Sequence, residues 1–158
     1  MQPADPAHAP TLSAATAAAI VQVLAPLDVR LTRHRRAVLG ALESSDRPLT
    51  VEEVVQAVGV PLSTVYRNLA ELVDAGVVVR VTGAGTGDRH ELAERFSERH
   101  HHHLVCTECG IVTDFDPSRQ LERLIHREID ALLATNGFEV THHVFDVRGR
   151  CRDCQHGA

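Results

Sequence analysis

The sequence predicts an α+β fold made of two small domains, and three observations carry this prediction. Apolar residues recur at helical spacing through most of the first half, until a β-branched stretch at 77–82 predicts a hairpin. In the second half, short apolar stretches flank one long amphipathic helix, expected at about 117–136. Two Cys-x-x-Cys pairs enclose that helix, so a bound metal can supply stability that a small core lacks.

Composition limits the class of protein. The 158 residues are 44% hydrophobic and 23% charged, which is typical of a globular chain. A net charge of −5 argues against a general nucleic-acid coat, because non-specific binding requires neutralised phosphates, but local basic patches are compatible with it. Since neither a bilayer-spanning run nor a secretion signal is found, we expect a cytoplasmic protein without a membrane partner. In that compartment, four cysteines are expected to be metal ligands or redox groups rather than disulfides.

Two helices are predicted first along the chain. Residues 1–10 are rich in Pro and Ala and are expected to be disordered. Apolar residues then recur helically through Ala14–Leu24, and Pro26 ends this stretch. Thr32 is a candidate N-cap for the second helix, whose apolar residues share one face.

A helix-turn-helix is predicted next. Thr50 and Glu53 have the spacing of a capping box, which indicates the start of a short helix. After a turn of a few residues, Ser63 is expected to begin another helix. We assign both helices to a first domain at 11–93.

A hairpin and a linker follow. The stretch at 77–82 is β-branched apart from one Arg, glycines at 83–87 supply a turn, and 89–92 can return as the partner strand. A hairpin beside a helix-turn-helix is the wing of a winged-helix domain. Charged residues at 94–100 suit a hinge, and 101–158 are expected to form a second, small α+β domain.

Four cysteines give the strongest chemical signal. Two residues between the cysteines of a pair let both sulfurs reach one tetrahedral Zn²⁺ at about 2.3 Å. A redox pair is the alternative, but a redox Cys-x-x-Cys normally occurs once. We therefore predict a structural zinc site, without an open position for catalysis. Its ligands are Cys106, Cys109, Cys151 and Cys154.

Four consecutive histidines run directly into the first cysteine pair. If this segment is extended, alternate imidazoles point to opposite faces. His101 and His103 would then serve one metal site, while His100 and His102 serve another. An engineered tag is the alternative, but tags lie at chain ends rather than against a hydrophobic strand.

Other candidate ligands are individually weaker, because a lone His, Asp or Glu is more often a solvated surface side chain. They gain weight from the density of histidines, since eight of the eleven fall between His90 and His143. The candidates are Glu91 on the wing, Asp114 on the next strand, Glu122 and His126 on the long helix, and His142 and His143 on an expected final strand.

The second helix of the helix-turn-helix begins with groups that can bind DNA. Short hydroxyls, a phenol, a guanidinium and an amide can contact phosphates and base edges in the major groove. An ordinary amphipathic helix is the alternative, which the wing and the basic cluster at 33–36 make less favourable. The candidate DNA contacts are Arg30, Arg33, Ser63, Thr64, Tyr66, Arg67 and Asn68.

Taken together, these motifs resemble the ferric uptake regulator family. The resemblance covers nearly everything after Val29 and rests on Pro61-Leu-Ser-Thr-Val-Tyr-Arg-Asn-Leu, the Arg89-His-Glu-Leu turn, His100-His-His-His-Leu-Val-Cys-x-x-Cys and the terminal Cys-x-x-Cys. It implies a homodimer with an N-terminal winged helix and a zinc-stapled dimerisation and metal-sensing domain at 101–158. It also implies a repressor of metal-uptake or stress genes that binds double-stranded operator DNA, with structural Zn²⁺ and a regulatory Fe²⁺, Mn²⁺ or Zn²⁺.

The resemblance also assigns ligands. The family's sensory site at the hinge falls on Glu91, His101, His103 and Asp114. A second site falls on His100, His102 and His143, with either Glu122 or His126 as its helix ligand. Many members have a further hinge histidine near 47–49, which this chain lacks, and His34 and His90 are the nearest substitutes in sequence.

Two other function classes explain less of the sequence. A zinc hydrolase needs an open zinc position and a nearby general base such as Glu91, and no nucleophile-base constellation accompanies it, so we expect no enzyme. A metal buffer or zinc-ribbon interaction module would leave the Tyr66 and Arg67 helix and the wing without a role.

Overall fold

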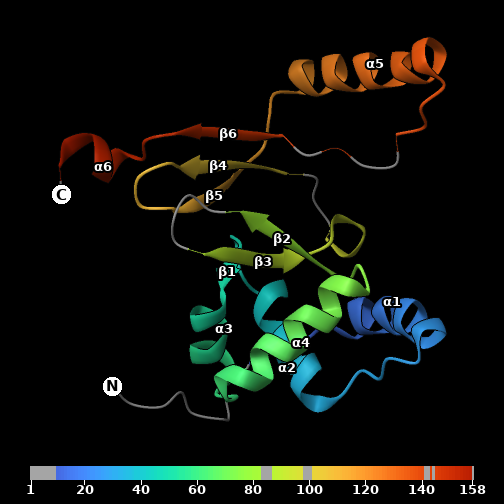
Figure 1. Cartoon of the computed structure of the whole chain (residues 1–158), viewed down its shortest axis with the longest axis vertical. Helices are drawn as coiled ribbons and strands as arrows, with labels where there is room; N and C mark the ends of the chain where they lie inside the picture. The colour runs from blue at the N-terminus through green and yellow to red at the C-terminus, as the bar shows by residue number, and fades with distance from the viewer. Residues whose placement is uncertain (1–9, 83–86, 98–100, 141–142, 144, 158) are drawn as a thin grey trace.

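The computed structural model describes residues 10–82, 87–97, 101–140, 143 and 145–157, arranged as two sheets with helices at both ends (Figure 1). The helices are α1 (Ala14–Leu24), α2 (Arg33–Glu43), α3 (Val51–Val58), α4 (Leu62–Asp74), α5 (Arg119–Asn136) and α6 (Arg152–His156), with short 3-10 turns η2 (Ala25–Leu27) and η3 (Glu94–Phe96). The strands are β1 (Leu49–Thr50), β2 (Val78–Thr82), β3 (Asp88–Leu92), β4 (His102–Cys106), β5 (Val112–Phe115) and β6 (Asp146–Gly149). The predicted α+β composition is confirmed.

Helices α1 to α4 enclose an aliphatic core. Ile20 of α1, Leu39 of α2 and the pair Leu69 and Leu72 of α4 are almost completely buried in it. Each such side chain contributes about 1.5–3 kcal/mol by leaving water. This core holds α4 against α2 and α3.

The boundaries of the helix-turn-helix follow from its capping residues. Glu53 N donates to Thr50 Oγ1 at 3.2 Å and Thr50 N donates to Glu53 Oε2 at 2.8 Å, so the predicted capping box is confirmed. Gly59 ends α3 with a φ of 64°, which glycine adopts without strain. Helix α4 begins directly after Pro61, one residue before the predicted Ser63, because the fixed φ of proline already suits the entry into a helix.

The predicted wing is present as the antiparallel pair of β2 and β3. Strand β3 begins one residue before the predicted 89–92, and the turn at 83–86 lies outside the described residues. A further strand, β1, pairs Leu49 with His90 and gives the order β1-β3-β2. The sequence did not predict β1, since two residues are too few to show alternation.

The second sheet has the order β5-β4-β6. Strand β4 pairs antiparallel with β5 and parallel with β6, so His103 has Asp114 on one side and Asp146 on the other. A parallel pair needs a long crossover, which here contains α5. Three separate segments of the chain therefore meet around the central strand.

The final strand differs from its prediction. The apolar run at 140–147 predicted a strand that includes His142 and His143, but β6 begins at Asp146. The reason is register: Asp146 pairs with the second residue of β4, so earlier residues have almost no strand left to pair with. His143 precedes β6, and His142 lies outside the described residues.

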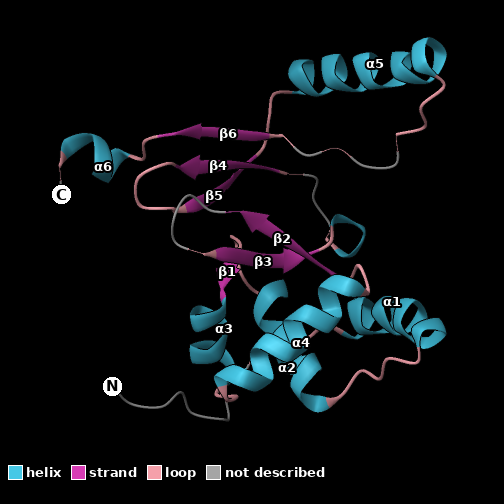
Figure 2. Ribbon diagram, viewed as in Figure 1, coloured by secondary structure: helices cyan, strands magenta, loops and turns pink. Residues whose placement is uncertain are grey.

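Helix α5 lies at the end of the molecule opposite α1 to α4 (Figure 2). It begins at Arg119, close to the predicted start at about 117. Leu121, Leu124 and Leu132 of its apolar stripe are 36–40% exposed, so the chain only partly covers this face. Neither α5 nor any other described helix is long and apolar enough to cross a membrane.

The two halves meet where the wing lies against the second sheet. Val81 of β2 is buried with Val105 of β4 and Val112 of β5 in a small separate core. Beside it, Arg89 of β3 donates to the carbonyl oxygen of Gly110 at 3.3 Å. Of the predicted hinge at 94–100, Glu94–Phe96 form η3, and residues 98–100 are outside the described set.

Candidate metal centres and nucleic-acid interface

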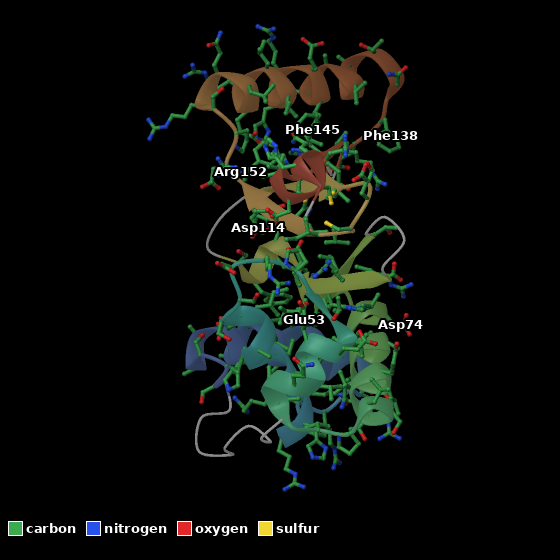
Figure 3. All side chains as sticks on the ribbon, turned by 90° about the vertical axis from the view of Figure 1, so that its left-hand side faces the viewer. Glu53, Asp74, Asp114, Phe138, Phe145 and Arg152 are labelled. Atoms are coloured by element: carbon green, nitrogen blue, oxygen red, sulfur yellow. The ribbon has the colours of Figure 1, made fainter. Side chains whose placement is uncertain are left out.

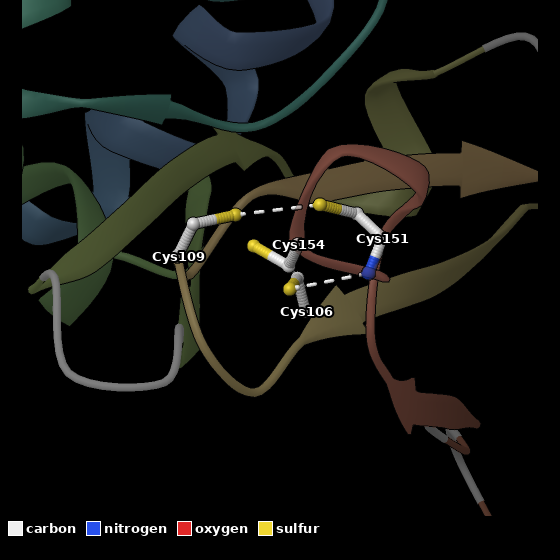
Figure 4. Close-up of side chains that lie close together, drawn as sticks. All are labelled: Cys106, Cys109, Cys151 and Cys154. Atoms are coloured by element: carbon white, nitrogen blue, oxygen red, sulfur yellow. Dashed lines mark hydrogen bonds between the residues drawn. The ribbon is translucent and has the colours of Figure 1, made fainter. Parts of the chain in front are cut away.

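The four cysteines come together from two distant segments at one end of the second sheet (Figure 4). Their sulfurs all lie within 4.8 Å of one another, and none is in a disulfide. Cys109 Sγ lies 3.7 Å from Cys151 Sγ. Sulfurs held tetrahedrally at about 2.3 Å from one zinc are about 3.8 Å apart, so the group has the spacing of a zinc tetrad.

Backbone amides help to ionise one of these sulfurs. Cys151 N donates to Cys106 Sγ at 3.3 Å. The amides of Cys151, Cys109 and Glu108 lower the pKa of Cys106 to about 6. The neighbouring Cys151 and Cys109 sulfurs raise the pKa of Cys154 well above its usual value. Crowded sulfurs that cannot all ionise together are the arrangement that a bound divalent cation relieves.

The second group joins the wing to the second sheet. It comprises Glu91 of β3, His101 just before β4, His103 of β4 and Asp114 of β5, whose donor atoms lie within 4.8 Å of one another. His101 Nε2 and His103 Nε2 lie 3.1 and 3.3 Å from the Glu91 carboxylate. Each also lies 3.9 Å from an Asp114 oxygen. Donors around one ion at about 2.1 Å are roughly 3.0–3.4 Å apart, so a small inward shift would complete such a site.

The electrostatics of this group fit a cation. Burial raises the pKa of Glu91, but hydrogen bonds from His101 and His103 outweigh it and hold the pKa below its ordinary value. Burial raises the pKa of Asp114, and the nearby Glu91 charge adds to the effect. Asp114 Oδ1 is buried and makes no hydrogen bond to any described residue. A buried carboxylate oxygen of this kind is costly unless a ligand satisfies it.

A cleft opens onto the same group. Its volume is about 390 Å³, and Glu91, His101 and Asp114 line one side of it. Ser13 and Thr16 of the α1 region and Glu43 at the end of α2 line the other. Asp114 is labelled in Figure 3, between the two halves of the molecule. The cleft gives small polar species a route to the donor atoms.

The third group lies on the other face of β4. His102, Glu122 and His143 bring their donor atoms within 4.8 Å of one another. His102 Nε2 lies 3.3 Å from Glu122 Oε2. His126 Nε2 is 3.7 Å from Glu122 Oε1 but falls outside the group, and its side chain is 59% exposed. Of the two helix candidates, Glu122 is therefore the one within the group, while His100 lies outside the described residues.

Neither substitute for the additional hinge histidine joins the Glu91 group. His90 pairs with Leu49 of β1 and Arg80 of β2. It precedes Glu91 in β3, so its side chain leaves the opposite face of the sheet from that of Glu91. Burial lowers the pKa of His90, as does the charge of Arg80. His34 belongs to none of the groups found among the described residues.

The predicted DNA contacts divide into exposed and buried side chains. Tyr66 is 52% exposed, and Ser63, Arg67, Arg30 and Arg33 are also exposed, with Thr64 partly so. Asn68 is only 6% exposed and packs with the core face of α4, so its side chain is not available to DNA in this conformation. Figure 1 shows the first turns of α2 and α4 at the end of the molecule farthest from α5.

Sequence reasoning missed two residues beside these groups. Asp146 Oδ1 lies 3.3 Å from His103 Nδ1, a contact set by the pairing of β6 with β4. Arg89 of the wing contacts Glu53, Pro48 and Gly110. The sequence did offer a signal for both, because each is a charged residue within three positions of a proposed metal ligand: Arg89 near Glu91, and Asp146 near His143.

Comparisons with known proteins agree on one family. The model described as the ferric uptake regulator family matches residues 27–148. The chain is 32% identical over 134 residues to the peroxide-responsive repressor PerR of Staphylococcus aureus, which covers 80% of this chain and 83% of PerR.

Solved structures give the same result. The ferric uptake regulator from Pseudomonas aeruginosa with manganese is 28% identical, with a TM-score of 0.65 over 83% of this chain and 96% of that one. The ferric uptake regulator of Vibrio cholerae is 28% identical, with a TM-score of 0.62 over 84% of this chain and 99% of that one. The chain therefore belongs to the ferric uptake regulator family, whose members are transcription regulators rather than enzymes.

Proposed function

We propose that this chain is a metal-responsive repressor that binds an inverted-repeat DNA operator as a homodimer and controls metal-uptake or oxidative-stress genes. One observation carries the proposal: Glu91 of the wing meets His101, His103 and Asp114 of the second sheet. A regulator needs its sensing site to contact both the DNA-binding part and the rest of the molecule. This donor group does so.

The donor set fits a divalent metal. Two imidazoles and two carboxylates suit Fe²⁺, Mn²⁺ or Zn²⁺, and coordination strength alone does not select among them. The buried Asp114 oxygen and the low pKa of Glu91 supply the anionic oxygens that such an ion requires. A bound ion there supplies coordinate bonds between the wing and the second sheet. The manganese-containing relative and the peroxide-responsive relative make both metal and peroxide signals candidates.

The residues around the site would convert metal binding into a change of DNA affinity. Glu91 lies on β3, which pairs with β2, and Val81 of β2 packs against Val105 of the second sheet. Drawing Glu91 towards His101 and His103 fixes the angle between the winged helix and the second domain. Coupling between two sites is typically about 1–3 kcal/mol, which corresponds to a roughly 5- to 150-fold change in affinity.

The DNA interface is assigned to the exposed first turns of α2 and α4. Tyr66 and Arg67 can contact base edges, while Ser63, Thr64, Arg33 and, just before α2, Arg30 can contact phosphates. A two-fold dimer presents two such helices to two half-sites, which is why an inverted repeat is expected. Asn68 is left out because it is buried.

The second domain is assigned to dimerisation, with the cysteine group as a structural zinc site. The partly exposed stripe of Leu121, Leu124 and Leu132 on α5 is an apolar face of the kind that buries against another subunit. The zinc ties the end of β4 to the end of the chain and so supplies folding energy. His102, Glu122 and His143 are assigned to a second metal site.

Operator binding with and without metal tests the proposal. The purified protein, with its zinc retained, would be titrated against a labelled operator and a scrambled duplex of equal length at fixed salt. We expect tight binding to the operator only after Fe²⁺ or Mn²⁺ is added, with a dimer in both states. Equal affinity for the two duplexes, or a monomer, would contradict it.

A further inference from the structure

We propose that Asp146 is a positioning residue for the metal-sensing group: it holds the His103 ring so that Nε2 faces Glu91 and Asp114. The inference rests on the proposed function, because it concerns how one proposed ligand is oriented. Asp146 is not one of the four donors, since its carboxylate lies on the far side of the ring.

The two ring nitrogens of His103 face different partners. Nδ1 lies 3.3 Å from Asp146 Oδ1, and Nε2 lies 3.3 Å from the Glu91 carboxylate. An ionised carboxylate can only accept a hydrogen bond, so Nδ1 carries the proton in the contact with Asp146. Nε2 also faces a carboxylate, so without a metal it donates to Glu91. A divalent cation there would displace that proton and take the Nε2 lone pair, while Asp146 keeps the proton on Nδ1. A carboxylate behind a metal-binding histidine fixes the tautomer and orientation of the ring and makes it more basic.

The sheet register makes this contact rigid. His103 and Asp146 are direct partners in the parallel pair of β4 and β6, so their side chains leave the same face of the sheet. Both are largely buried, with side chains 9% and 20% exposed. Few alternative rotamers are open to such a pair, and the ring is therefore held in place.

The cysteine group holds β6 in this register. Three residues after Asp146, Gly149 pairs with Cys106, and the Gly149 carbonyl accepts a hydrogen bond from Thr107 N at 2.7 Å. Cys151 N then donates to Cys106 Sγ. The same strand that leads into the last two cysteines thus carries the carboxylate behind His103. Strand β6 therefore connects the two sites: its first residue, Asp146, contacts the sensing group, and its end leads into the cysteine group.

Metal titration of Asp146 variants tests the inference. Asp146→Val removes the acceptor while keeping a residue that suits a strand, and Asp146→Glu keeps the carboxylate. Asp130→Asn, on the exposed face of α5 opposite the apolar stripe, is the control for loss of one negative charge. Mn²⁺ and Co²⁺ affinities would be measured by competition with a chelator, together with the Co²⁺ absorption spectrum, zinc content and thermal midpoint.

We expect Asp146→Val to weaken binding of both ions about 10- to 100-fold and to change the Co²⁺ spectrum, with zinc content and thermal midpoint near wild type. Asp146→Glu should recover most of the affinity, and Asp130→Asn should match wild type. If the Val variant unfolds, Asp146→Asn takes its place, because it keeps the shape of the side chain and removes the charge, and a loss of affinity is again expected.

Two outcomes would overturn the inference, and they separate a failure of the Asp146 role from a failure of the proposed sensing site. Wild-type affinity and an unchanged spectrum in a folded Asp146→Val protein would refute the role of Asp146 alone. If wild-type protein binds neither ion beyond its zinc, the proposed sensing site fails as well, and the role of Asp146 falls with it.

Discussion

Arg89 on the wing strand donates from Nε to the carbonyl oxygen of Gly110, 3.3 Å away in the loop that follows the first cysteine pair. Its other end reaches the helix-turn-helix, where Nη1 lies 3.2 Å from Glu53 Oε2 on α3. One buried guanidinium therefore links the capping box of the helix-turn-helix, the wing and the cysteine loop. The domains touch through defined polar contacts as well as through the Val81 cluster.

Removing this guanidinium should cost more stability than removing an exposed one. Arg89→Met removes the donor to the Gly110 carbonyl oxygen and one of the donors to Glu53, which keeps its bonds from Arg47 and Thr50, so we expect the free energy of unfolding to fall by about 1.5–3 kcal/mol. Arg80→Met is the matched control, because Arg80 pairs with Asp88 at 3.2 Å on the exposed side of the same hairpin. Exposed pairs contribute about 0–1 kcal/mol. Denaturant titration measures both, and equal losses would count against a linking role for Arg89.

Acid should weaken the contribution of Glu53 to the stability of the folded protein. Arg47 lowers the pKa of this carboxyl through a hydrogen bond, and that effect outweighs burial. A lowered folded-state pKa means that the stabilisation is complete above the unfolded value of 4.5 and is lost as the pH falls through the folded value. We therefore expect the stability advantage of wild type over Glu53→Gln to be constant near pH 6–7 and to shrink below about pH 4.5. A stability advantage of wild type that grows on acidification would contradict a lowered pKa of Glu53 in the folded protein.

The cysteine group should be required for folding rather than for sensing. Cys151→Ser removes one of four clustered sulfurs, and binding energy at a structural zinc site is folding energy. Zinc loss should accompany loss of the native second domain, as seen by near-ultraviolet circular dichroism and by elution volume. His101→Ala should keep its zinc. A Cys151→Ser protein that lacks zinc and still folds to the wild-type oligomer would contradict the structural role.

The exposed start of α4 should determine operator affinity. Arg67→Ala and Tyr66→Phe alter exposed side chains, so binding should weaken while zinc content and thermal midpoint stay unchanged. A lost base contact typically costs about 1–3 kcal/mol. Asn68→Ala should behave differently and lower the thermal midpoint, because Asn68 is buried. Anisotropy titrations at fixed salt separate the two effects, and a purely structural loss in Arg67→Ala would argue against DNA reading.

Short-range features were predictable from sequence, whereas contacts across the sheets were not. The Thr50 and Glu53 capping box depends on three residues of spacing, and the opposite directions of His102 and His103 follow from strand alternation. The contact of His103 with Asp146 depends on the register of two strands 43 residues apart, which no local pattern specifies. The burial of Asn68, in contrast, was predictable, because it follows Val65 by three residues and shares its helix face.

The most direct test of the central claim is operator affinity of His103→Ala and His143→Ala, each with and without added Fe²⁺ or Mn²⁺, at fixed salt and with zinc retained. If the Glu91, His101, His103 and Asp114 group is the switch, wild type and His143→Ala will gain roughly 5- to 150-fold in affinity on adding metal. His103→Ala will gain little or nothing while remaining a folded dimer. A wild-type metal response in His103→Ala, with the response lost in His143→Ala, would contradict the account and move the switch to the His102, Glu122 and His143 group.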